Sequence, residues 1–188
     1  MKVISLYTNE KKLIQKAAKN DRKAQKQIFD KHAPRMLSVC RQYISPVETA
    51  EEIMLNGFFK AFKNIKKYNH NGSFEGWLRR IMVNSCLDHL RKKNPFKFAA
   101  PIDEVKDETD DDGMDDCNLE MHVLQSVIDA LPIGYKSVFL MYVVDGYKHH
   151  EIAEILDISV NTSKTQLRKA KLQLQQEINS LKRQQYEA

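Results

Sequence analysis

Four polar side chains near the carboxyl end of the chain have a spacing that suits contact with DNA. Residues 151–167 read EIAEILDISVNTSKTQL, in which an apolar-spaced run breaks at residues 157–159 and a second helix-like run follows. In a helix that begins near Val160, one polar face would carry Asn161, Lys164, Thr165 and Arg168. Two short helices with such a break are typical of a helix-turn-helix, whose second helix enters the DNA major groove.

The residues around this break predict how the two helices pack. We expect Ser159 to cap the second helix, because a serine hydroxyl accepts a backbone N–H at that position. The apolar side chains that should face one another across the two helices are Val160, Leu167, Ala170, Ile152, Ile155 and Leu156. An ordinary helical hairpin with a solvated face would share this pattern, so this stretch alone leaves both interpretations open.

A second candidate nucleic-acid surface follows the loop KKYNHNGSF, in the segment EGWLRRIMVNSCLDHLRKKN. On a helix, one arc of about 80° would hold Trp77, Arg80, Asn84, Asp88 and Arg91. Beside it, the expected buried stripe consists of Leu78, Ile81, Met82 and Cys86. Aromatic rings stack on unpaired bases and guanidinium groups bind phosphates. A solvated charged helix with one half-buried tryptophan is the competing interpretation.

A third stretch has a face that burial in the core does not explain. Its expected buried stripe consists of Ala50, Ile53, Met54, Gly57, Phe58, Ala61, Phe62 and Ile65. The remaining face carries Glu52, Leu55, Asn56, Phe59 and Lys63. Apolar residues rimmed by charge are common at interfaces, so this face is a candidate docking surface. A neighbouring helix that covers it is the alternative.

The composition favours a helical protein that binds a polyanion. The chain has 188 residues, 42% of them hydrophobic, with only 6 Gly and 5 Pro, and few alternating β-branched runs. Residues 1–100 hold 21 Lys and Arg against 8 Asp and Glu. No signal peptide or membrane span is expected. Cys40, Cys86 and Cys117 form no CxxC pair, and we expect the first two to be reduced core residues of a cytoplasmic protein.

An acidic segment separates two predicted helical domains. Residues 101–120 hold 10 Asp and Glu against a single Lys and show no helical stripe. We therefore predict an all-α protein with domains at residues 1–97 and 120–188, joined by a flexible acidic linker at residues 98–119. Glu108 to Gly113 superficially resembles a calcium loop. Its twelfth position is Leu119, however, and the glutamate that should close the loop, Glu120, comes one place late.

These segments together resemble the extracytoplasmic-function sigma factors, a branch of the sigma-70 family of bacterial RNA polymerase. The resemblance extends from about residue 13 to 93 and from about residue 131 to 178. It is carried by DRKAQKQIFDKHAPRML, TAEEIMLNGFFKAF, GSFEGWLRRIMVNSCLDHLRKK and ALPIGYKSVFLMYVVDGYKHHEIAEILDISVNTSKTQLRKAKLQL. Each segment alone is weakly specific, but their order and spacing are strongly specific.

The resemblance implies a promoter-specificity factor without enzymatic activity of its own, in which sigma region 2 forms a helical bundle and sigma region 4 a helix-turn-helix. The residues implied to bind the minus-thirty-five element are Asn161, Thr162, Lys164, Thr165, Arg168 and Lys169. Those implied to capture the single-stranded minus-ten element are Tyr68, Asn69, Asn71, Phe74, Trp77, Arg80, Asn84 and Arg91. Those implied to bind polymerase are Glu51, Glu52, Leu55, Asn56 and Phe59.

The implied partners are core RNA polymerase, through its clamp and flap regions, and promoter DNA in duplex and single-stranded form. An anti-sigma factor is a further candidate partner. No cofactor, metal, catalytic residue or membrane insertion is implied, and the expected location is the cytoplasm, at the nucleoid. The family resemblance also suggests that the acidic linker threads the basic nucleic-acid channel of the polymerase.

The sequence departs from the family pattern at several positions. Leu55–Asn56 replaces the usual Gln-Glu, Asp157 stands where a turn glycine is usual, and Ser163 replaces an apolar residue of the recognition helix. Two other classes of protein remain as alternatives. A stand-alone helix-turn-helix regulator would not explain the face from Glu52 to Phe59 or the helix that carries Trp77. A metal-dependent nuclease would need rigidly placed ligands, which the acidic segment does not offer.

Overall fold

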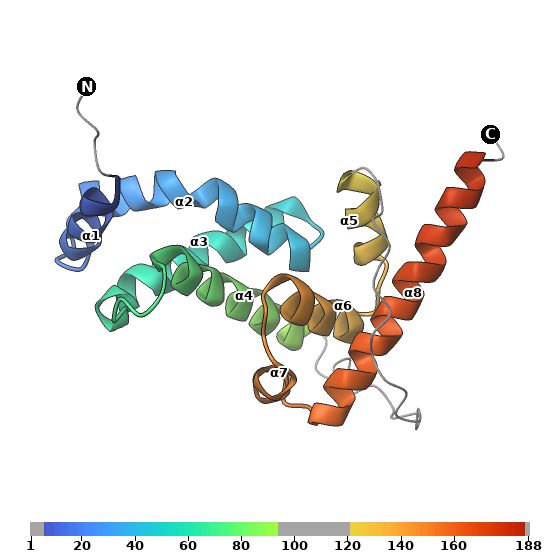
Figure 1. Cartoon of the computed structure of the whole chain (residues 1–188). Helices are drawn as coiled ribbons and strands as arrows, with labels where there is room; N and C mark the ends of the chain where they lie inside the picture. The colour runs from blue at the N-terminus through green and yellow to red at the C-terminus, as the bar shows by residue number, and fades with distance from the viewer. Residues whose placement is uncertain (1–5, 94–120, 187–188) are drawn as a thin grey trace. The chain divides into compact units, whose positions relative to one another are not determined.

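The computed structural model describes residues 6–93 and 121–186, and every regular element in these two ranges is helical (Figure 1). The chain forms two compact units, Met1–His89 and Leu90–Ala188. The all-α prediction is thereby confirmed. The predicted linker and its boundaries at residues 97 and 120 lie outside the described residues, so they stay predictions. No helix in the described ranges is long and apolar enough to span a membrane.

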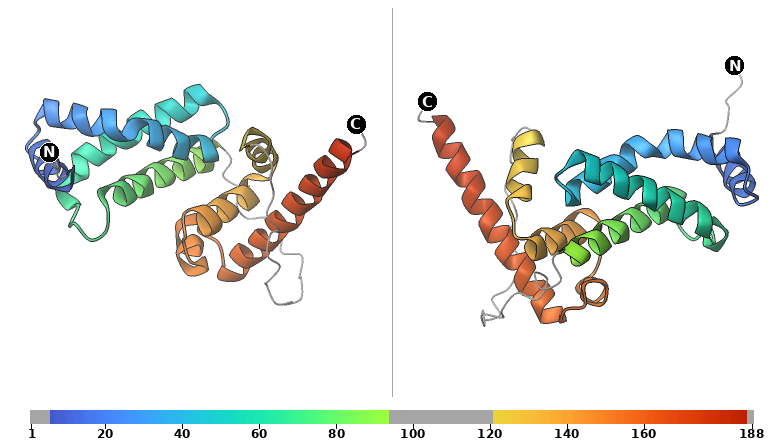
Figure 2. Two further views of the ribbon diagram at one scale, coloured as in Figure 1. Left: turned by 45° about the horizontal axis from the view of Figure 1, so that its top comes forward. Right: turned by 180° about the vertical axis from the view of Figure 1, so that it is seen from behind.

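The first unit is built from four helices. They are α1 (Leu6–Ala17), α2 (Arg22–Tyr43), α3 (Val47–Asn64), extended by the 3-10 turn η1 (Ile65–Lys67), and α4 (Phe74–Lys93). Helices α2, α3 and α4 lie alongside one another, and α1 folds back at the amino end of α2 (Figures 1 and 2). The largest fully buried side chains of this unit include Ile28, Met36, Leu78, Met82 and Leu87.

Local signals explain where α1 ends and α2 begins. Asn20 adopts a left-handed conformation with φ 62°, and the Asp21 side chain then accepts the backbone N–H groups of Lys23 and Ala24 at 2.9 and 3.1 Å. These two residues therefore end one helix and start the next. Helix α2 continues through Pro34, where the sequence pattern weakens. Pro34 is exposed, so water can satisfy the carbonyl that the missing N–H leaves without its helical partner.

Gly57 of α3 makes room for the Met82 side chain of α4. A Cβ atom at Gly57 would lie 2.4 Å from the Met82 sulfur, closer than side chains tolerate. Cys40 and Cys86 are buried free thiols of the same core, as predicted. A hydrogen bond with Cys86 lowers the pKa of the Cys40 thiol.

The second unit packs shorter helices along one long helix. Its elements are α5 (Met121–Asp129), α6 (Ile133–Phe139), the π-helical turn η2 (Leu140–Val144), α7 (His149–Leu156) and α8 (Val160–Tyr186). Helices α5, α6 and α7 all pack against α8. Fully buried side chains at the centre of this unit include Leu140, Met141, Ile152, Leu174 and Ile178. Helix α8 thus supplies both part of the core and the polar face predicted to meet DNA.

Candidate nucleic-acid interface

The turn between α7 and α8 has the predicted geometry. Helix α7 ends at Asp157, which is left-handed with φ 55° and ψ 51°, and the N–H of Ile158 bonds to the Ala153 carbonyl at 3.0 Å. The Ser159 hydroxyl accepts the N–H of Thr162 at 2.9 Å, so Ser159 is the cap. An aspartate thus occupies the left-handed position that usually favours glycine.

The amino-terminal turns of α8 present most of the predicted minus-thirty-five residues to solvent. Asn161 and Lys164 are exposed, and Thr165, Arg168 and Lys169 are half-buried. Thr162 differs from the expected exposed face, since it is only 9% exposed and its hydroxyl lies 2.8 Å from that of Ser159. Thr162 is therefore part of the helix cap. The polar face therefore consists of the other five residues, of which Asn161 and Lys164 are the most exposed.

The opposite side of α8 packs largely as predicted. Leu167 and Ala170 are buried, as are Ile152 and Leu156 of α7, while Ile155 is half-buried. Val160 was expected to pack against α7, but it is 41% exposed. It is the first residue of α8, where no preceding turn of the helix covers its side chain.

The unusual Ser163 has a specific polar partner. Its side chain is fully buried, and its hydroxyl lies 2.9 Å from His149 Nδ1. The His149 ring stacks on Tyr142 with centroids 4.5 Å apart. A hydrogen bond therefore takes the place of the apolar contact usual in the family.

An aromatic cluster forms the predicted minus-ten loop of the first unit. The half-buried rings of Tyr68 and Trp77 have centroids 5.6 Å apart, and His70 lies 4.7 Å from Tyr68. Phe74 contacts both Tyr68 and Trp77, at 5.3 and 5.5 Å. Phe74 itself is only 3% exposed, although the resemblance implied that it contacts DNA. It is therefore a buried support for the rings of Tyr68 and Trp77. Tyr68 and Trp77 are the aromatic residues here with surface available for stacking.

Backbone geometry holds this loop in a tight conformation. His70 and Gly72 have positive φ, 62° and 87°, and the Tyr68 hydroxyl donates to the Gly72 carbonyl at 2.8 Å. The Asn69 side chain accepts the N–H of Asn71 at 3.1 Å. Asn69 and Asn71 are both exposed.

The predicted polar stripe of α4 faces solvent. Arg80, Asn84 and Asp88 are exposed, with Trp77 and Arg91 half-buried at its ends. The Asp88 carboxylate lies 3.6 Å from Lys60 Nζ. Ile81, expected in the buried stripe, is only half-buried and so borders the polar face. The stripe extends along α4 to the last turn of the helix, which holds Arg91, Lys92 and Lys93.

The predicted docking face of α3 is fully available. The five residues implied to bind polymerase, Glu51, Glu52, Leu55, Asn56 and Phe59, are all exposed, as is Lys63 of the same face. Leu55 is 53% and Phe59 70% exposed, so no described helix of the first unit covers them, contrary to the alternative interpretation. The opposite face of α3 is buried as predicted, except that Phe62 is half-buried. Helix α3 thus has a core face and an apolar face open to solvent.

The structure shows a further apolar surface that sequence analysis missed. Tyr142, Val143 and Val144 are 40%, 49% and 44% exposed on the π-helical turn of the second unit. This run is continuous with buried Leu140 and Met141, so the sequence showed only an apolar segment. Among the described side chains, no group of three or more His, Cys, Asp and Glu could hold a metal ion.

Two family models match this chain. The sigma-70 region 2 model matches residues 28–96, and the sigma-70 region 4 model matches residues 121–174. The ECF RNA polymerase sigma factor SigW of Bacillus subtilis (strain 168) is 28% identical over 183 residues, covering 91% of this chain and 97% of that protein. The ECF RNA polymerase sigma-E factor of Escherichia coli (strain K12) is 22% identical over 180 residues, covering 90% and 94%.

Two solved structures share the fold. The sigma factor RpoE of Bartonella quintana, in complex with the anti-sigma factor NepR, has a TM-score of 0.55 at 17% identity, covering 82% of this chain and 96% of that chain. CnrH in complex with the cytosolic domain of CnrY has a TM-score of 0.52 at 17% identity, covering 91% and 97%.

The helix-turn-helix of the second unit and the four-helix first unit therefore place this chain in the sigma-70 family, with regions 2 and 4 in that order. Within that family it is an RNA polymerase sigma factor of the extracytoplasmic-function type, a transcription initiation factor that directs core polymerase to promoters.

Proposed function

We propose that the three exposed surfaces described above divide the work of initiation. The α3 face docks core RNA polymerase, the aromatic loop and α4 capture the minus-ten element as single strand, and the amino-terminal face of α8 binds the minus-thirty-five element as duplex. The observation that carries this assignment is the exposure of Leu55 and Phe59, because a stand-alone DNA-binding protein has no use for that face.

Docking on polymerase uses the apolar centre and the polar rim of the α3 face. Leu55 and Phe59 supply the apolar area that association buries, and Glu51, Glu52 and Asn56 surround them. Because Leu55–Asn56 stands where the family usually has Gln-Glu, this face is more apolar than is usual in the family.

Capture of the minus-ten element replaces base pairing in the duplex with stacking of the unpaired base on aromatic side chains. Extruding a base costs a few kcal/mol, and stacking on an aromatic ring returns about 1–3 kcal/mol per base. Tyr68 and Trp77 offer ring surface for one unpaired base, while Asn69 and Asn71 offer amides to its edge. Arg80 and Arg91 extend along α4, where guanidinium groups suit the phosphates of the captured strand.

Recognition of the minus-thirty-five element uses α8 in the major groove. Asn161, Lys164 and Arg168 recur along one side of the helix, which suits contacts to base edges and phosphates. The chain itself carries out no bond-making step, since nucleotide addition belongs to the polymerase. It acts in the cytoplasm at nucleoid DNA. An anti-sigma factor is a fitting regulator, since both solved structures of this fold are complexes, one of them with an anti-sigma factor.

Run-off transcription tests the proposal directly. Core polymerase should initiate at a cognate promoter only when this chain is added, and permanganate should then detect unpaired thymines in the minus-ten element. A stand-alone regulator would instead bind a palindromic duplex tightly as a homodimer without polymerase. Promoter-specific initiation that does not depend on the added chain would refute the proposal.

A further inference from the structure

A buried histidine lies directly beneath the minus-ten loop. His32 of α2 is 4% exposed, and its ring packs edge-on against Phe74 with centroids 5.7 Å apart. Phe74 in turn contacts Tyr68 and Trp77. His32 is therefore separated by a single ring from both aromatic side chains assigned above to the captured base. None of the surfaces assigned above includes His32.

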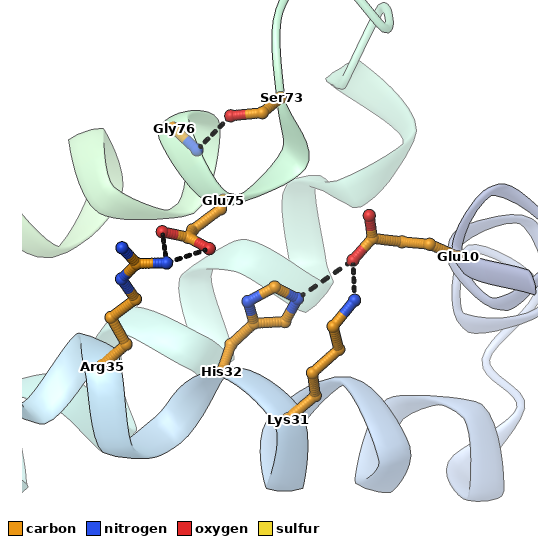
Figure 3. A network of polar contacts seen from close by, with 7 residues as sticks. All are labelled: Glu10, Lys31, His32, Arg35, Ser73, Glu75 and Gly76. Carbon is orange, nitrogen blue, oxygen red and sulfur yellow. Dashed lines mark hydrogen bonds and ion pairs between the residues drawn. The ribbon is translucent and has the colours of Figure 1, made fainter. Parts of the chain in front are cut away.

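Helix α1 holds the other side of the imidazole. His32 Nε2 lies 3.3 Å from Glu10 Oε1, and Lys31 Nζ lies 2.6 Å from the same oxygen (Figure 3). The hydrogen bond from Lys31 keeps the pKa of the Glu10 carboxyl below its ordinary value, so Glu10 is ionised at neutral pH. A carboxylate can only accept, so it orients the ring with Nε2–H toward α1.

A neighbouring ion pair between Arg35 and Glu75 also connects α2 to α4, but more weakly. Arg35 Nη1 lies 2.9 Å from Glu75 Oε1 at the start of α4, but the Arg35 side chain is 72% exposed (Figure 3). Ser73 accepts the N–H of Gly76 at 3.0 Å and fixes only the first turn of α4. The buried link from α2 to the aromatic rings of the loop therefore runs through His32.

We propose that His32 is a positioning residue for the minus-ten element: its ring, oriented by Glu10, supports Phe74 and thereby sets the arrangement of Tyr68 and Trp77. This inference rests on the proposed function of the loop. It adds that α1 and α2, which do not touch the captured base, determine how well the loop holds it. Small displacements of a binding group cause large losses of affinity, so a support of this kind has a measurable effect.

The charge state of His32 is set by its surroundings. Burial lowers the pKa of the imidazole, and Lys31 of α2 lowers it further, while Glu10 of α1 and Glu75 of α4 act in the opposite direction. The ring is therefore neutral at pH 7. The folded pKa lies below the unfolded value, so the unfolded chain binds the proton first. Stability from the neutral ring is present above that unfolded pKa and is lost as the pH falls below it.

The test measures capture of a single-stranded minus-ten oligonucleotide by the full chain bound to core polymerase. His32→Asn removes the ring and should weaken capture by about tenfold or more. His32→Phe restores an uncharged ring against Phe74 and should keep capture within about threefold of wild type. Affinity for core polymerase and for minus-thirty-five duplex should be the same in all three proteins. Equal capture by His32→Asn and wild type would overturn the inference.

The single tryptophan of the chain provides a second readout that does not need a destabilised variant. Trp77 fluorescence of the wild type should change in a step as the pH falls through the folded pKa of His32. His32→Phe should abolish this step. His70→Gln should retain it, which separates His32 from the other histidine of the cluster. A titration that His32→Phe leaves unchanged would overturn the inference even if His32→Asn failed to fold.

A third variant separates failure of the inference from failure of the proposed function. Trp77→Ala should reduce capture because it removes a stacking ring. If Trp77→Ala has no effect, the loop does not capture the base, and the proposed function fails together with the inference. If Trp77→Ala reduces capture and His32→Asn does not, the inference alone fails.

Discussion

Lys164 and Arg168 lie one turn apart on the amino-terminal half of α8, and their assigned role makes a direct prediction. Replacing each with alanine should cost ~1–3 kcal/mol of promoter binding, because each removes a contact to a base edge or phosphate. Transcription from a minus-thirty-five-dependent promoter should fall by a factor of roughly 5 to 150 for each change.

The matched control for these substitutions is Arg183→Ala, which removes an exposed cation near the other end of the same helix. It should leave promoter use unchanged. Wild-type transcription by the Lys164→Ala, Arg168→Ala double variant would contradict the assignment of the α8 face.

Asp157 shows how one residue determines the geometry of the turn. Its left-handed conformation, φ 55°, is tolerated by aspartate and strongly disfavours β-branched residues. Asp157→Val should therefore lower the free energy of unfolding by ~1–2 kcal/mol, while Asp157→Gly should not destabilise. Thermal unfolding followed by circular dichroism measures both. Glu154→Val, on an exposed helical position, should cost no more than ~0.7 kcal/mol, and an equal loss at both positions would argue against backbone strain.

At the scale of elements, α3 is amphipathic in an unusual way, since its solvent face has an apolar centre. Phe59→Asp should weaken binding to core polymerase by ~2 kcal/mol or more, because it places a charge at an apolar contact. Helicity should persist, because Phe59 is 70% exposed and contributes little to the core. A pull-down with core polymerase and a circular dichroism spectrum measure the two effects.

Gln27→Asp provides the control, because it adds the same charge at an exposed position of another helix, α2. It should bind core polymerase like wild type. If Phe59→Asp binds equally well, α3 is not the docking helix.

At the scale of the whole molecule, the uneven charge of the sequence is the main feature still to be tested. Residues 101–120 hold 10 acidic side chains against a single lysine, more than a simple connector needs. Replacing Asp110, Asp111, Asp112, Asp115 and Asp116 with asparagine keeps length and size. If this segment mimics RNA in the basic channel of polymerase, initiation or promoter escape should change while affinity for core polymerase persists.

Two other outcomes of the asparagine substitutions point to different roles for the acidic segment. Stronger DNA binding by the free protein, greatest at low salt, would indicate that the segment screens the basic first unit. No change in transcription or DNA binding would indicate that its charge serves only solvation. Run-off yield and a salt series of DNA-binding affinities distinguish the three results.

The sequence by itself determined features that depend on helical periodicity. The start of α8, its Ser159 cap, and the two faces of α3 all follow from residue spacing within a few turns. Such features need no knowledge of distant parts of the chain. The order and spacing of the segments likewise identified the family.

Only the tertiary structure decided which side chains were left for function. Phe74 has the sequence signature of a loop aromatic, but contacts with His32 and Trp77 bury it. The contact between His32 and Phe74 joins helices that are far apart in sequence. Local spacing contains no information about such contacts, because they arise only when α2 and α4 pack together.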